Sequence, residues 1–194
     1  MTRKDSLLVA SKSGELDRFE PEHIREMLHE RDEAGMSALV NAIAYGQLHN
    51  IPRELITKEN MLVKDPVRGY TPMHWAAQLG FLDLLPAELI TKENLLTPDD
   101  HHWTPLHSLA RHGHIDTLPL NLLTEENLLV PSKTGRTCLE ILRENNELDK
   151  ILGIQLSESS KEIVGAAWFQ RNQKVVQARK ELETNSQEPE IELY

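Results

Sequence analysis

A segment of about 33 residues repeats along this chain, and the period restricts the fold more than any single residue does. Five positions that follow apolar runs are 32, 34, 33 and 33 residues apart: Gly14, Gly46, Gly80, Gly113 and Asn146. Two further sets keep nearly the same period, the prolines Pro21, Pro52, Pro86 and Pro119 and the Thr-x-x-Asn threonines Thr57, Thr91 and Thr124. A period of about 20–50 residues predicts stacked units, each too small to bury its apolar face alone. Such stacks usually provide binding surfaces.

The third repeat shows how one unit is expected to fold. Thr71 is a good N-cap, Pro72 suits the first helical position, and Gly80 suits a left-handed helix end, so a short helix is predicted over 72–79. Pro86 and Thr91 then each begin a helical piece, which predicts a return leg of two short helices. A turn or hairpin leads from there to the next Thr-Pro pair.

Two stretches carry a family resemblance: Thr71-Pro72-Met73-His74-Trp75-Ala76-Ala77 and Thr104-Pro105-Leu106-His107, in register with Gly80 and Gly113. They resemble the ankyrin repeat, whose pattern is Gly-x-Thr-Pro-Leu-His-x-Ala-Ala-x-x-Gly. The resemblance implies an all-α solenoid of about five helix-pair repeats with hairpin connections, followed by a C-terminal helix. The repeats are expected at about 1–31, 32–65, 66–98, 99–131 and 132–152. The return leg, Leu-Pro-x-x-Leu-Ile-Thr-Lys-Glu-Asn-Leu-Leu, departs from the family pattern, so the outer layer is expected to differ.

The resemblance also implies a function, which is recognition of another protein through the hairpin tips and the concave face of the first helices. Transferring these contact positions gives nine candidate partner-binding residues: Tyr45, Arg68, Tyr70, Leu79, His101, Trp103, Arg111, His112 and Arg136. Aromatic residues and arginine dominate binding hot spots. The alternative for Tyr70 and Trp103 is packing of hairpin on hairpin. In this family His74 and His107 are expected to link adjacent repeats by side-chain hydrogen bonds.

The segment 153–183 is expected to form one further helix, from about Glu158 to about Leu182. Its apolar or small residues fall on one helical face: Val164, Trp168, Val175, Ala178 and Leu182. We favour a cap over the last repeat, because an uncovered end repeat exposes its core. The alternative is a partner or dimerisation helix. The segment 184–194 is acidic and is expected to be disordered.

Charge and motifs narrow the function classes. With 31 acidic and 21 basic residues the net charge is −10, so nucleic acid and anionic membranes are poor partners. No apolar stretch is long enough to span a membrane. The single cysteine, Cys138, cannot form an internal disulfide, which favours a reducing, cytoplasmic location.

Motifs of phosphate binding and of serine or zinc hydrolysis are absent from the sequence, so no cofactor or metal is expected. The sequence therefore predicts a non-catalytic interaction module that is monomeric on its own and binds another protein. One alternative is an assembly subunit that self-associates through the C-terminal helix. A lesser alternative is a metal-dependent enzyme using a histidine cluster: His101, His102, His107, His112 and His114.

Overall fold

The computed structural model describes residues 3–185, with the side chains of residues 7–184. Regular secondary structure in this range is helical throughout. The two extended pairings in it are single-residue bridges, Arg31 with Ser37 and Pro131 with Thr137. The prediction of an all-α fold is therefore confirmed.

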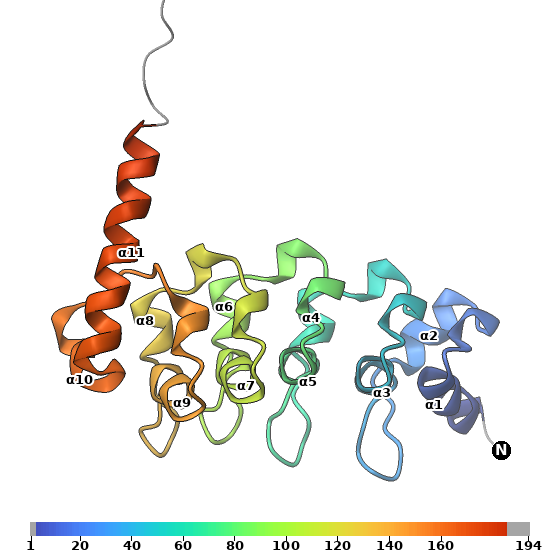
Figure 1. Ribbon diagram of the computed structural model, residues 1–194. Helices are drawn as coiled ribbons and strands as arrows, with labels where there is room; N and C mark the ends of the chain where they lie inside the picture. Colours follow the sequence, from blue (N-terminus) through green and yellow to red (C-terminus); the bar gives the residue numbers. More distant parts are fainter. Residues whose placement is uncertain (1–2, 186–194) are drawn as a thin grey trace, which may run out of the picture.

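Five inner helices lie side by side in one row (Figure 1). They are α1 (Arg3–Ser13), α3 (Ala38–Ala44), α5 (Pro72–Leu79), α7 (Pro105–His112) and α9 (Cys138–Glu144). Each packs against the next along the row. The loops that lead into α3, α5, α7 and α9 all project from the same side of the row, and the outer helical pieces lie on the other side.

The inner helices begin and end as their sequences predict. In α5 the Thr71 hydroxyl accepts from the backbone N–H of His74 at 3.3 Å, Pro72 occupies the first turn, and Gly80 ends the helix at φ 74°. A left-handed residue costs least as glycine. The helix α7 repeats this arrangement between Thr104 and Gly113.

The return leg contains three short pieces in each of the middle repeats, so the prediction of two pieces is incomplete. In the third repeat these are 3-10 helices η4 (Leu82–Leu84) and η5 (Ala87–Leu89), followed by α6 (Lys92–Leu95). Pro86 has ψ 131° and separates the first two pieces. It does so because the residue before a proline, here Leu85 at ψ 152°, is held in an extended conformation.

The other outer pieces follow the same order along the chain. Between the inner helices lie η1 (Leu16–Arg18), α2 (Pro21–Met27), η2 (Leu48–Asn50), η3 (Arg53–Leu55), α4 (Lys58–Met61), η6 (Ile115–Thr117), η7 (Leu120–Leu122) and α8 (Glu125–Leu128). After α9 come η8 (Leu148–Ile151), η9 (Glu158–Ser160), α10 (Lys161–Val164) and α11 (Ala166–Asn185).

The Thr-x-x-Asn element closes each return leg. In the third repeat Thr91 caps α6, and the Asn94 side-chain amide donates to the Leu89 carbonyl at 2.9 Å. Asn60 and Asn127 make the same bond in their repeats, at 2.7 and 2.8 Å. The asparagine therefore satisfies a carbonyl that the break between η5 and α6 would leave unpaired.

Leucine, isoleucine, methionine and alanine fill a single core between the two layers. The small side chains of Ala76 and Ala77 are fully buried and let neighbouring inner helices approach closely. Cys138 is also fully buried in this core, and burial raises the pKa of its thiol. Cys138 therefore has a packing role in the core.

The C-terminal segment differs from its prediction. One continuous helix over 158–182 is wrong, because Gly165 at φ 82° and ψ 143° separates α10 from α11. The Trp168 side chain is buried and its indole N–H donates to Asp149 at 3.2 Å. Asn172, also buried, accepts from the Gly153 N–H at 2.7 Å, so the first half of α11 covers the last repeat as a cap.

The second half of α11 extends beyond the row of repeats (Figure 1). Its apolar face was predicted too far along the chain: Val176 is buried, whereas Ala178 is exposed and Leu182 is 69% exposed. The helix continues to Asn185, and the rest of the predicted acidic tail, residues 186–194, lies outside the described residues.

Candidate functional site

One aspartate fixes the conformation of each of three loops that lead into inner helices. The Oδ1 atoms of Asp32, Asp65 and Asp99 each accept from two backbone N–H groups two to four residues later, at 2.8–3.0 Å. These bonds fix the loop conformation as an aspartate turn does. In the sequence, Asp99 with Asp100 is typical of a turn, as found, whereas no such role was predicted for Asp32 and Asp65, although the spacings of 33 and 34 between the three residues repeat the period of the glycines.

Neighbouring loops are joined through their backbones. The Asp100 N–H donates to the Arg68 carbonyl and the Lys133 N–H donates to the His101 carbonyl, both at 2.9 Å. The loops of the third, fourth and fifth repeats thus form one continuous edge.

The histidines of the Thr-Pro-x-His motif connect each inner helix to the next loop. The Nδ1 atom of His74 accepts from the Thr71 N–H at 3.2 Å, so its Nε2–H donates to the Trp103 carbonyl at 3.0 Å. His107 bonds the Arg136 carbonyl in the same way at 3.2 Å. Burial lowers the pKa of His74 to about 4, so the ring is neutral at pH 7. The linking role expected of both histidines is thus present.

Tyr70 and Trp103 form the wall between the loops and the inner helices. The Tyr70 hydroxyl lies 3.0 Å from Gln78 Oε1 and 3.1 Å from Ser108 Oγ. The Trp103 indole N–H donates to Ser108 Oγ at 3.2 Å. Burial raises the pKa of the Tyr70 phenol. Because their polar atoms already have partners on α5 and α7, both rings support the scaffold and present only their remaining ring surface.

A groove of about 940 Å³ lies between these loops and the inner helices. Its walls come from α3, α5 and α7 and from the loops that precede them, so it crosses the second, third and fourth repeats. Six of the nine predicted partner-binding residues line it: Arg68, Tyr70, His101, Trp103, Arg111 and His112. Six of the nine candidates, predicted from repeat register, therefore share one continuous surface.

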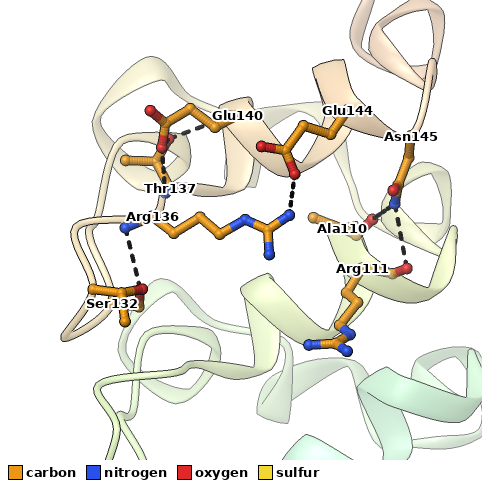
Figure 2. Close-up of polar contacts among 9 residues, drawn as sticks. Ala110, Arg111, Ser132, Arg136, Thr137, Glu140, Glu144 and Asn145 are labelled. Carbon is orange, nitrogen blue, oxygen red and sulfur yellow. Dashed lines mark hydrogen bonds and ion pairs between the residues drawn. The ribbon is translucent and has the colours of Figure 1, made fainter.

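Three predicted residues do not line the groove. Tyr45 is 55% exposed at the end of α3, and Leu79 packs partly against the core. Arg136 reaches across to Glu144 in an ion pair, and next to it Asn145 donates to the last carbonyls of α7 (Figure 2). Arg136 is therefore committed to its own repeat.

The groove also has lining residues outside the nine predicted ones, and three of these matter for recognition. Val67, at the tip of its loop, is 77% exposed. Trp75 is half-buried and meets the Tyr70 ring edge-on at 5.7 Å, and its indole N–H has no hydrogen-bond acceptor among residues 7–184. Arg31 donates to two backbone carbonyls of the loops, at 2.7 and 3.3 Å. The position of Trp75 inside the motif was a usable signal, because it faces the same side as the motif's contact positions.

The charged side chains of the groove differ in whether they are already bonded to other residues. Arg68 and Arg111 are exposed, and neither forms an ion pair within the described part of the chain. The Arg111 guanidinium lies over the Trp103 ring at 5.7 Å, a cation–π geometry. Figure 2 shows its side chain extending away from the polar contacts around it. Asp65 and Asp99, by contrast, are bonded to their own loops.

The histidine cluster of the sequence is not brought together. His107 is held in its capping box, and across residues 7–184 no three histidine, cysteine, aspartate or glutamate side chains are grouped closely enough to hold a metal ion. Burial, with the neighbouring Arg111, lowers the pKa of His112, so that ring is neutral at pH 7. The groove consequently offers recognition chemistry: guanidinium groups, aromatic faces and an indole donor.

Comparison with protein-family models and with curated protein sequences gives no match to this chain. Among residues 3–185, none of the helices combines the length and the apolar character that crossing a membrane requires.

Proposed function

We propose that this chain is a non-catalytic adaptor of the ankyrin-repeat type that binds a partner protein through the groove across its second to fourth repeats. The observation that carries the proposal is the gathering of six predicted contact residues, from two adjacent repeats, on one continuous surface. The repeated Thr-Pro-x-His capping boxes, with each histidine bonded to the next loop, support the assignment to this type. A buried, unreactive Cys138 supports a reducing, cytoplasmic setting.

The surface also has the composition of a recognition site. Aromatic residues and arginine supply most hot-spot energy at interfaces, and the groove contains Tyr70, Trp75 and Trp103 beside Arg68 and Arg111. The polar atoms of Tyr70 and Trp103 are already hydrogen-bonded, so these two rings are preorganised and lose little entropy when a partner binds.

The test is to fill the groove without changing its charge. Ala34→Trp and Val67→Trp, both at exposed loop positions that line the groove, add bulk there; Ala87→Trp is the matched control on the exposed outer layer. Tagged proteins of verified helicity are used to capture partners from a lysate of the cells that make the protein. We expect the control to retain the wild-type partner and both groove variants to lose it. Equal capture by all of them would refute the proposal.

Self-association through α11 is the second candidate function, and it has weaker support. The second half of the helix stands clear of the repeats, as a partner helix would. It carries one large exposed apolar side chain, Leu182, in the described part of the chain. One such residue gives far less than the roughly 800 Å² per partner of a stable interface. Light scattering of wild type beside Leu182→Ser decides this: equal monomer masses remove self-association.

A further inference from the structure

The groove concentrates positive charge in an acidic chain. The whole sequence has 31 acidic and 21 basic residues, whereas the groove lining contains three arginines, Arg31, Arg68 and Arg111, against two carboxylates, Asp65 and Asp99. Each carboxylate already accepts two N–H bonds from its own loop, and Asp99 is buried. The charge that the groove offers to a ligand is therefore positive.

Two of these arginines are available for a ligand. Arg68 and Arg111 are exposed and unpaired within residues 7–184, and both line the same groove as Tyr70. The Arg111 guanidinium carbon lies 5.7 Å from the centre of the Trp103 ring, and its N–H groups form no hydrogen bond within residues 7–184. The planar guanidinium group of arginine matches the geometry of a carboxylate, which it binds through two parallel hydrogen bonds.

Apolar surface lies beside these cations. Val67 is 77% exposed on the loop next to Arg68, and the half-buried Trp75 ring forms part of the floor with an indole N–H that has no acceptor among the described residues. An apolar side chain of a ligand fits against these two residues, and a backbone carbonyl of the ligand fits the indole N–H.

The length of the groove sets the length of its ligand. Three adjacent helices, about 8–10 Å apart, span roughly 16–20 Å, which about six extended residues cover. We propose that the groove binds an extended acidic peptide segment of the partner, with carboxylates at Arg68 and Arg111 and an apolar side chain against Val67 and Trp75. This inference rests on the proposed function and specifies the chemistry of the partner.

The first experiment selects ligands without knowing the partner. A phage-displayed library of random heptapeptides is panned on immobilised wild-type protein, with Arg68→Gln/Arg111→Gln protein used for counter-selection. We expect enriched peptides to contain two or more aspartate or glutamate residues and at least one aromatic or branched aliphatic residue. Enrichment of neutral or basic peptides, or no enrichment, overturns the inference.

The second experiment measures the affinity of the most enriched peptide by fluorescence anisotropy. Arg68→Gln and Arg111→Gln are each expected to weaken binding about tenfold or more, because each removes a charge-assisted hydrogen bond. Arg53→Gln, at an exposed arginine of the outer 3-10 helix η3, is the matched control and is expected to change the affinity less than about twofold. Equal weakening by all three variants, or by none, overturns the inference.

Failure of this inference is distinguishable from failure of the proposed function. If the tryptophan variants of the groove lose the captured partner while panning selects no acidic peptide, the groove binds a partner of other chemistry and only the inference fails. If wild-type protein instead sediments as a dimer that Arg111→Gln dissociates, the occupant is a second copy of the chain, and the inference also fails.

Discussion

The link made by His74 predicts a stability that depends on pH. Its Nδ1 accepts from Thr71 and its Nε2–H donates to Trp103, so the folded chain requires the neutral ring. Burial lowers the pKa in the folded state to about 4, whereas an exposed histidine titrates near 6.5. Between these values the unfolded chain binds more protons. The contribution is therefore complete above about pH 6.5 and is lost as the pH falls toward 4.

The size of the effect follows from the same pKa difference. Each pH unit in this window costs about 1.4 kcal/mol of the free energy of unfolding. Lowering the pH from 7 to 5 crosses about 1.5 units of the window, so His74 alone is expected to remove about 2 kcal/mol. For a marginally stable domain that is a large fraction of the total.

The assay is urea unfolding, followed by far-ultraviolet circular dichroism at pH 7 and pH 5, for wild type and His74→Gln. Glutamine keeps an acceptor at the third helical position for the capping box and does not titrate. We expect the wild type to lose about 2 kcal/mol more than the variant between the two pH values. His107, whose pKa burial also lowers, remains in both proteins, and its effect cancels. Equal losses in the two proteins would show that His74 is not the source of the pH dependence.

Three further predictions concern stability and are checked by the same unfolding measurement. Asn94→Ala is expected to lower the free energy of unfolding by about 1–3 kcal/mol, because it leaves the buried Leu89 carbonyl unpaired. The control Asn121→Ala, at an exposed position, should lower it by less than about 0.5 kcal/mol. Equal losses would contradict the role of the Asn94 hydrogen bond. Gly80→Ala should lower the free energy of unfolding more than Gly46→Ala does. Both glycines have positive φ, but only at Gly80 would an added Cβ meet a histidine ring of the next repeat, at 2.7 Å. The reverse order would contradict this packing. His102 is at φ 55°, so His102→Gly should add about 0.5–1 kcal/mol of stability, and a loss would contradict the strain at this loop.

Much of the fold was predictable because the decisive signals are local. Thr71, Pro72 and Gly80 act on the backbone within one helix, so the sequence alone places the inner helix correctly. The break at Gly165 was not predicted, because a single glycine in a helical pattern is often tolerated, and only packing against the last repeat decides the matter. The shift of the buried face to Val176 has the same origin.

Repeat register predicts which candidate residues share a surface, but it does not predict the contacts that each of them makes. Repeat register brought six predicted residues to one groove, since equivalent positions of stacked units fall on one face. Repeat register does not predict which polar atoms are already bonded to other residues of the stack. Ser108 lies 38 residues after Tyr70 yet bonds its hydroxyl, and Arg136 is taken by Glu144. Such contacts depend on side-chain direction across repeats, which the period alone leaves open.

The most direct test of the groove as the partner-binding surface is site-specific photocrosslinking. The photoreactive residue p-benzoylphenylalanine is placed at Val67, on the exposed tip of a groove loop, or at Leu84, which is 50% exposed on the outer layer. Each protein is irradiated in a lysate of the cells that make it, and adducts are detected by mass spectrometry. We expect a discrete protein adduct from position 67 and none from position 84. An adduct from position 84 alone, or the same adduct from both positions, would contradict this expectation.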